Sequence, residues 1–257
     1  MLIFDKSVSH LARHMIFGRF SESHSQDIAP TAHGNLILGV HYVKTDKKSD
    51  TQVSREGIQE TLKLGRQLIP ALSEKDVITS FAGILANSNM SRDGDFFIAP
   101  SEQAPGVMHV MVGAPGLSAA PAIADYVIQL LGDAGWRTVE NADFNPRRRG
   151  WPRFETAPMA KKQQMIDTDP KYGHVLCRCE QVTEAEILQS IRRGAHTMDA
   201  VKHLTRAGMG RCQGGFCAPF VLKQLANELG IAPTRVTKNG PGSHQILKMT
   251  KAVADNE

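Results

Sequence analysis

The sequence predicts an α+β fold, in which a mixed or antiparallel sheet with helices is followed by a small all-α domain. Three observations support this prediction. Over residues 1–140, short apolar runs bounded by Gly, Pro, Asn or Asp, as strands are, alternate with helical patterns. Residues 173–235 instead carry three short helical patterns, each followed by a glycine. Every cysteine of the chain lies in this second region, which we call the helical domain.

The first region contains four predicted strands, with one predicted helix between the first two of them. The helix is predicted at residues 54–69, where Ile58, Leu62 and Leu68 recur on roughly one face. Ser54 is the predicted N-cap of this helix. The strands are predicted at residues 35–43, 76–85, 95–99 and 107–114. This order of strand, helix and further strands indicates mixed α and β structure.

A second helix is predicted after the last strand, within residues 113–135. The turn before it holds Gly113, Gly116 and Ser118, whose small side chains leave the N–H groups of a helix start open to an electron-rich ligand. Glycine and serine also make tight turns, so spacing alone leaves a ligand site and a plain turn as alternatives. An apolar stripe at helical spacing supports the helix and consists of Ile123, Tyr126, Val127, Leu130 and Leu131.

The chain divides into four parts that differ in amino-acid composition and in residue pattern. Residues 141–172 carry four prolines, a cluster of arginines and no clear periodicity, so we expect a linker there. The mixed region, residues 1–140, lies before the linker, and the helical domain, residues 173–235, lies after it. Residues 236–257 are expected to form a polar tail.

Composition and charge exclude several function classes. The 257 residues are 41% hydrophobic and 22% charged, and no apolar run approaches the roughly 18 residues that a membrane span needs. The start of the sequence does not have the pattern of a secretory signal, which predicts a cytoplasmic protein with reduced thiols. The formal charge of +4 is small and gathers partly in the linker, so no nucleic-acid surface is predicted.

The first helix of the helical domain begins with a predicted capping box. Thr183 precedes Glu186 by three residues, the spacing at which each side chain satisfies the backbone N–H group of the other. Thr197 is the predicted cap of the second helix, which stops at Gly208, and the third helix stops at Gly230. A domain of about 60 residues has a small core, and a metal site is one device that stabilises such a domain.

The four cysteines stand at the two ends of one segment, Cys177 and Cys179 as C-x-C and Cys212 and Cys217 as C-x4-C. Disulfides are disfavoured by the predicted compartment and by the closeness of the first pair in sequence. Four thiolates suit a tetrahedral zinc ion, although zinc sites usually separate paired cysteines by about two to four residues. A two-iron cluster also takes four thiolates, spread over two metal centres. The spacing favours an iron–sulfur cluster and leaves zinc and unligated thiols as alternatives.

Two strings around these cysteines, CRCEQVTEAEI and TRAGMGRCQGGFC, resemble the bacterioferritin-associated-ferredoxin type of [2Fe–2S] domain. They are most similar to the version fused to the C-terminus of FAD-dependent glycerol-3-phosphate dehydrogenases of the anaerobic type. All four ligand positions of that motif are filled in this sequence. The resemblance therefore implies a [2Fe–2S] cluster bound by all four cysteines.

The first region resembles the second half of the oxidoreductase domain of the same family. The strings PTAHGNLILG, DVITSFAG and PGLSAAPAIADYV are similar to successive landmarks of that domain. In the family, the turn before the last helix lies against the flavin. The residues for which this implies FAD contacts are Gly113, Gly116, Leu117 and Ser118. The resemblance thus implies a partial flavin-oxidoreductase domain followed by an all-α [2Fe–2S] domain.

Two departures from the family pattern bear on function. The sequence has no G-x-G-x-x-G turn, the element that holds the ADP part of FAD in the family. We therefore expect a partial FAD site, completed by a separate polypeptide that supplies the ADP-binding half, with a truncated gene as the alternative. In addition, Leu85 stands where the family has an arginine that meets the anionic substrate. A leucine cannot make that bidentate contact.

The resemblance implies a component of an FAD-dependent dehydrogenase, whose cluster passes electrons to an acceptor protein or to a quinone-linked subunit. This role is compatible with a cytoplasmic protein and with one held at the inner membrane face through partners. His33 matches a histidine of the family near the active cavity, but no catalytic residue is assigned, because the flavin carries the chemistry. The alternative is a non-catalytic iron–sulfur module, and a structural zinc domain is a third hypothesis.

Overall fold

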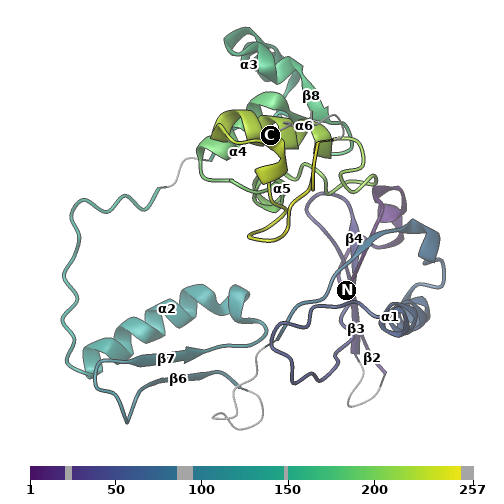
Figure 1. Cartoon of the computed structure of the whole chain (residues 1–257). Coiled ribbons are helices and arrows are strands. Elements are labelled where there is room, and N and C mark those ends of the chain that lie inside the picture. The colour runs from purple at the N-terminus through teal and green to yellow at the C-terminus, as the bar shows by residue number, and fades with distance from the viewer. Residues whose placement is uncertain (21–24, 86–94, 148–149, 250–257) are drawn as a thin grey trace, which may run out of the picture. The chain divides into compact units, whose positions relative to one another are not determined.

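The computed structural model describes all residues except 21–24, 86–94, 148–149 and 250–257 (Figure 1). Packing divides the chain into two compact units. The first comprises Met1–Tyr42, Val53–Ser80 and Gly150–Glu257, and the second comprises Val43–Gln52 and Phe81–Arg149. The first unit contains two separate hydrophobic cores, one against a sheet and one among helices.

The first of these cores belongs to a sheet of five antiparallel strands in the order β2-β3-β4-β1-β5, here called the N-terminal sheet. Its strands are β1 (Leu2–Phe4), β2 (Ile16–Arg19), β3 (Ser25–Pro30), β4 (Leu36–Gly39) and β5 (Val77–Ser80). Two 3-10 helices, η1 (Lys6–Leu11) and η2 (Glu74–Asp76), lie in its connections. Alternate residues such as Leu2, Phe4 and Leu38 are buried, because successive side chains of a strand point to opposite faces. The predicted strands at residues 35–43 and 76–85 are confirmed with shorter bounds.

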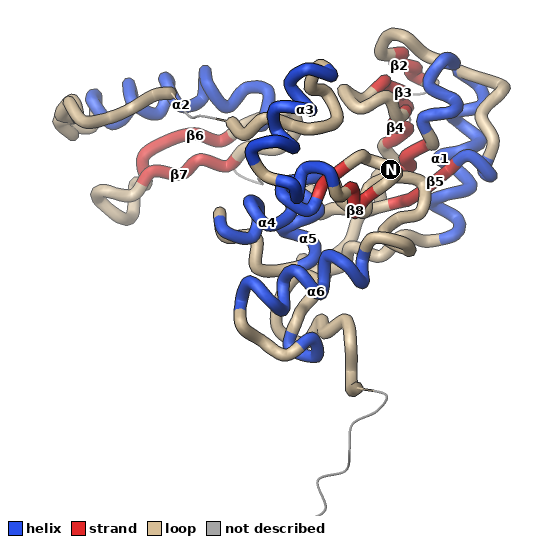
Figure 2. Tube along the Cα trace, turned by 90° about the horizontal axis from the view of Figure 1, so that it is seen from above, coloured by secondary structure: helices blue, strands red, loops and turns tan. Residues whose placement is uncertain are grey.

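Helix α1 (Arg55–Leu68) packs against the N-terminal sheet beside β3 and β4 (Figure 2). Ser54 caps the helix as predicted, with its Oγ atom accepting a backbone N–H at 3.0 Å. Leu62 is buried in the sheet core. Gly65 permits the close approach of helix and sheet, because a Cβ atom there would strike the Leu38 side chain. The helix predicted at residues 54–69 and its apolar face are therefore confirmed.

The second unit holds an antiparallel hairpin and one helix (Figure 1). These elements are β6 (Phe97–Pro100), β7 (Met108–Met111) and α2 (Gly116–Asp133), and they confirm the strands predicted at residues 95–99 and 107–114. In α2, all of which is described, no residue is fully buried. Ile123 and Val127 of the predicted stripe are half-buried, whereas Tyr126 is exposed. The apolar stripe of α2 is thus only partly covered within this unit.

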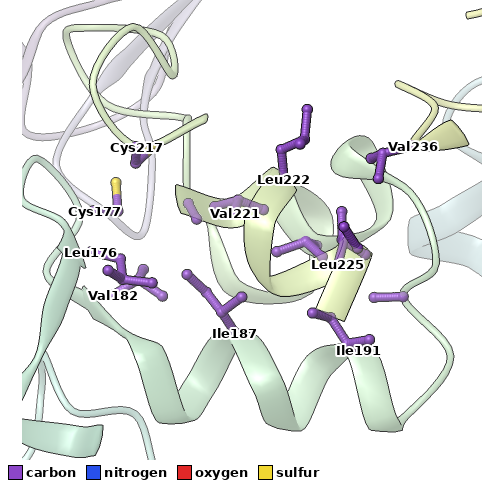
Figure 3. Close-up of a cluster of buried hydrophobic side chains, with 14 residues drawn as sticks. Leu176, Cys177, Val182, Ile187, Ile191, Cys217, Val221, Leu222, Leu225 and Val236 are labelled. Carbon is purple, nitrogen blue, oxygen red and sulfur yellow. The ribbon is translucent and has the colours of Figure 1, made fainter. Parts of the chain in front are cut away.

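The helical domain consists of three helices around an aliphatic core, as predicted. They are α4 (Glu184–Arg192), α5 (Met198–Thr205) and α6 (Ala218–Leu229). Figure 3 shows Ile187 of α4 facing Val221 and Leu225 of α6 in this core. A short antiparallel pair, β8 (Val175–Cys177) with β9 (Val182–Thr183), precedes α4 and adds strand structure to the small domain. The predicted α+β fold class is confirmed.

Segments on both sides of the helical domain are also folded. Helices α3 (Met159–Thr168) and η4 (Pro170–Gly173) lie in the predicted linker, and the Phe154 N–H donates to Glu186 at 3.1 Å. After η5 (Pro233–Arg235), Val236 is buried in the helical core, and Lys238 pairs with Asp199 at 2.8 Å. Contacts of the helical domain thus reach into the segments predicted as linker and tail, whose bounds stay predictions.

Replacing Thr183 with alanine is expected to destabilise the helical domain by about 1–2 kcal/mol, because the capping box is buried. Glu186 Oε2 accepts from the Thr183 N–H at 2.9 Å and from its hydroxyl at 2.8 Å. Thr197→Ala, at the half-exposed cap of α5, is the matched comparison and should cost less. Chemical denaturation followed by circular dichroism measures both variants. Equal losses would contradict the importance of the buried box.

Candidate metal centre

The four cysteines come from two turns at one end of the helical core. Cys177 ends β8, and Cys179 follows it in the next turn. Cys212 lies in the turn before α6, and Cys217 is the N-cap residue of α6. Cys177 and Cys217 are buried at the edge of the core (Figure 3), whereas Cys179 and Cys212 are exposed. The fold therefore brings the two motifs together, and each contributes one buried and one exposed thiol.

The thiols form two pairs, each with one member from each motif. The Sγ atoms of Cys179 and Cys212 lie 3.7 Å apart, and the Cys217 thiol donates to the Cys177 sulfur. Two thiolates on one tetrahedral metal ion, with bonds of about 2.3 Å, stand roughly 3.8 Å apart. Among the described residues, no three His, Cys, Asp or Glu side chains surround a single point closely enough to hold one ion. One metal position for each pair fits this arrangement better than a single zinc ion.

The buried pair shares its protons unequally. The hydrogen bond from the Cys217 thiol lowers the pKa of Cys177 to about 6, against the effect of burial, and the backbone N–H groups of Gly208 and Glu180 lower it further. The pKa of Cys217 is raised, because its proton is held by the Cys177 sulfur and because it is buried. One sulfur of the buried pair is therefore ready to bind metal as a thiolate near neutral pH.

The exposed pair is polarised by backbone N–H groups. The Phe216 N–H lowers the pKa of Cys212, and the Cys179 thiol and the Gly214 N–H act in the same direction. The Cys212 N–H acts to lower the pKa of Cys179. Burial and the hydrogen bond that the Cys179 thiol donates to the Cys212 sulfur act to raise it. The raising effects are larger, so the pKa of Cys179 is raised. Backbone donors around sulfur ligands stabilise negative charge at a metal centre.

The residues predicted to touch the flavin lie together in the second unit. Gly113 and Gly116 close the turn between β7 and α2, where the Gly116 N–H donates to the Gly113 carbonyl at 2.8 Å. Leu117 and Ser118 belong to the first turn of α2, and the Leu117 side chain is 93% exposed. The N–H groups of a first helical turn point out of the helix end. The geometry is that of an accessible helix N-terminus, and the flavin contacts stay a prediction.

Two other residues selected from the sequence lie outside these two sites. His33 sits in the turn between β3 and β4, and burial, followed by the charges of Arg206 and Arg153, lowers its pKa. Leu85 belongs to the second unit and is exposed. His33 and Leu85 therefore belong to different units, and neither is assigned a catalytic role.

A carboxylate that sequence reasoning missed lies next to the cysteines. Glu180 directly follows Cys179, and its side chain is 1% exposed. The Glu180 N–H donates to the Cys177 sulfur. Acidic residues are mostly exposed, so nothing in the sequence marks this one as buried. Its position beside the C-x-C motif was the only available signal.

Comparisons with known proteins bear on both regions. Residues 6–130 match the family described as FAD dependent oxidoreductase, and residues 175–227 match the BFD-like [2Fe-2S] binding domain. The chain is 38% identical to a glycerol 3-phosphate dehydrogenase of Caloramator mitchellensis over 254 residues. This similarity covers 97% of the chain and 52% of that protein.

Two further relatives are matched over less of their length. The A1 subunit of the anaerobic glycerol-3-phosphate dehydrogenase of Haloferax volcanii is 27% identical, over 63% of this chain and 33% of that protein. One subunit of the opine oxidase of Rhizobium meliloti is 37% identical, over 31% of this chain and 14% of that protein. The chain thus spans about half the length, or less, of the curated relatives it matches.

The two family matches confirm the resemblance found in the sequence and the two kinds of cofactor, FAD and a [2Fe–2S] cluster. They leave between them the segment that contains the arginine cluster and α3. Residues 6–130 therefore belong to the FAD dependent oxidoreductase family, and residues 175–227 belong to the BFD-like [2Fe–2S] binding domains.

Proposed function

We propose that this chain is the iron–sulfur-carrying component of an FAD-dependent dehydrogenase of the glycerol-3-phosphate dehydrogenase type. In this proposal all four cysteines hold one [2Fe–2S] cluster: Cys177, Cys179, Cys212 and Cys217. The observation that carries it is the arrangement of these thiols as two pairs across two turns, one pair buried and one exposed.

The chain's own groups suit a negatively charged cluster. The hydrogen bond from the Cys217 thiol lowers the pKa of Cys177, which favours the thiolate form of one buried sulfur. Backbone N–H groups of Gly208, Gly214 and Phe216 point at the sulfurs and stabilise negative charge there. The bound cluster supplies one-electron transfer, and the exposed pair of cysteines gives electrons a short path to the surface.

We propose further that the ADP part of FAD is held by a separate polypeptide. The sequence contains no G-x-G-x-x-G turn for it. The second unit, which carries the turn at Gly113 and Gly116, exposes large apolar side chains that a complementary half would cover. In the described part of this unit they include Val107, Val110, Leu117, Ile128 and Trp136.

The names of the relatives are the basis on which we propose a substrate and an electron acceptor. Glycerol 3-phosphate is the first substrate to test, because it stands in the names of two relatives. Leu85 offers no charge to a phosphate or carboxylate, so other 2-hydroxy acids and amino acids belong in the same assay. Two relatives are named as subunits, which supports an acceptor that is a partner protein or a quinone-linked subunit.

The location follows from the proposed partners. None of the helices that the structure describes is long and apolar enough to cross a membrane. We propose a cytoplasmic protein that reaches the inner membrane face, where it does so, through a partner subunit, because one relative is a subunit of an anaerobic glycerol-3-phosphate dehydrogenase. Fractionation of cells with and without that partner tests this placement.

Anaerobic co-purification with an ADP-binding half tests the proposed function. We expect the complex to retain FAD through gel filtration, and to contain about two iron atoms and two sulfides per chain. A true substrate should bleach the flavin absorbance and then generate the signal of the reduced cluster in electron paramagnetic resonance. A cluster without flavin in every preparation would support the non-catalytic iron–sulfur module instead. Zinc in place of iron would exclude electron transfer.

A further inference from the structure

The carboxylate of Glu180 forms two ion pairs inside the first unit. Its Oε1 atom lies 3.1 Å from Lys6 Nζ, and its Oε2 atom accepts a hydrogen bond from Arg206 Nε at 2.9 Å. The Glu180 side chain is 1% exposed, whereas those of Lys6 and Arg206 are 36% and 19% exposed. A buried carboxylate is unfavourable unless opposite charges compensate it, so these two contacts determine where Glu180 lies.

The two cations come from different parts of the first unit. Lys6 begins η1, which directly follows strand β1 of the N-terminal sheet. Arg206 is the C-cap residue of α5 and has a left-handed backbone conformation, with φ of 73°. Glu180 itself belongs to the turn that carries the exposed Cys179. One carboxylate therefore connects the C-x-C turn both to the sheet and to the helical domain.

A second ion pair makes a similar connection at the other cysteine motif. Arg211, which directly precedes Cys212, lies 3.5 Å from Asp5, the N-cap residue of η1. A cavity of about 150 Å³ lies among these charged groups, and Cys179 and Gly210 contribute to its wall. Both cysteine turns are thus tied to the same short segment of the N-terminal sheet.

From these contacts we infer that Glu180 is the positioning residue of the cluster site. It holds the turn that carries Cys177 and Cys179 against Lys6 and, by its charge, helps to set the reduction potential of the cluster. This inference rests on the proposed function, because it requires a cluster on the four cysteines. It gives Lys6 and Glu180, which are not ligands, opposite electrostatic effects on electron transfer.

The two charges lead to opposite expectations for two variants. Reduction adds one negative charge to the cluster, so a nearby carboxylate lowers the reduction potential and a nearby cation raises it. Glu180→Gln keeps the shape of the side chain and removes its negative charge, so we expect a more positive potential. Lys6→Met removes the positive charge, so we expect a more negative potential. If the substitutions acted only by loosening the turn, the reduction potential would shift in the same direction in both variants.

Redox titration of the full chain, followed by electron paramagnetic resonance, measures these shifts. Glu228→Gln is the matched control. Glu228 Oε2 lies 2.9 Å from Arg192 Nε in the same domain, so this variant also removes a carboxylate from an ion pair, but not from a cysteine turn. We expect its potential to equal that of the wild type. Shifts of equal sign in Glu180→Gln and Lys6→Met, or no shift in either, would overturn the inference. If Glu180→Gln is unable to hold a cluster, the Lys6→Met variant alone tests the inference. A reduction potential that is more positive than that of the wild type, or equal to it, would then overturn the inference.

Hydrogen exchange on the metal-free chain tests the anchoring separately from the cluster. We expect η1 and residues 178–181 to exchange faster in Glu180→Gln and Lys6→Met than in the wild type or in Glu228→Gln. Wild-type protein without iron would refute the proposed function, while the exchange data would still show whether Glu180 anchors the turn. Unchanged exchange in both variants would refute the anchoring, whatever the iron content.

Discussion

Replacing Cys212 with serine is expected to abolish the iron–sulfur cluster. Iron and acid-labile sulfide should fall from about two each per chain to near zero, because the cluster needs all four thiolates. Cys212 is exposed and pairs with Cys179 at 3.7 Å, so the smaller hydroxyl removes a ligand without opening a cavity in the core. Colorimetric iron and sulfide assays, together with the visible spectrum of anaerobic protein, measure the loss.

The Cys212→Ser variant is also expected to affect only one of the two hydrophobic cores of the first unit. The core of the helical domain includes Cys177 and Cys217, so loss of the cluster should loosen it, whereas the core of the N-terminal sheet contains no cysteine. Hydrogen exchange should therefore rise in α4 and α6 and stay unchanged in β1 and β4. Arg178→Lys, at an exposed site between two of the cysteines, is the control that should keep its iron. Iron retained in the Cys212 variant would exclude that residue as a ligand.

Helices of this protein were easier to predict from sequence than strands, because their signals are local. Ser54 and Thr183 marked helix starts that the structure confirms. Strands β1, β2 and β3 were missed. In β3 one of the two buried positions is Gln26, and a polar residue there hides the alternation that identifies a strand. Strand β1 has only three residues, too few for a periodic pattern, and its partners β4 and β5 lie far along the chain.

The metal centre was predictable in its ligand types but not in its geometry. Spacing alone indicated that the four cysteines act together. It could not indicate that each pair takes one thiol from each turn, because that depends on how β8 and α6 pack. The ion pairs of Glu180 join residues 174 positions apart in sequence, Lys6 and Glu180, and such contacts leave no local pattern. Residues that position a site are therefore found in the structure rather than in the motif.

Gly210→Ala is expected to disrupt the same site by crowding rather than by loss of a ligand. A Cβ atom at Gly210 would overlap the Cβ atom of Cys179 and would lie 3.2 Å from Glu180 Oε1. The backbone of Gly210 does not require a left-handed conformation, so the effect is one of space alone. Overpacking of a buried site costs about 1–3 kcal/mol, and here the movement would fall on a cysteine ligand. We expect a domain that unfolds at lower temperature and loses its iron to a chelator faster than the wild type.

Gly240→Ala provides the control for this substitution. A Cβ atom at Gly240 would meet nothing within 4 Å, so its stability should stay within about 0.5 kcal/mol of the wild type. A shift of 1 kcal/mol corresponds to roughly 4–8 °C in the melting temperature of a domain of this size, which thermal unfolding resolves. If Gly210→Ala matched Gly240→Ala in both melting and iron retention, close packing of the two cysteine turns would not matter for the cluster. If it lost iron while the metal-free forms melted alike, the crowding would act on the position of the Cys179 ligand alone and not on the stability of the fold.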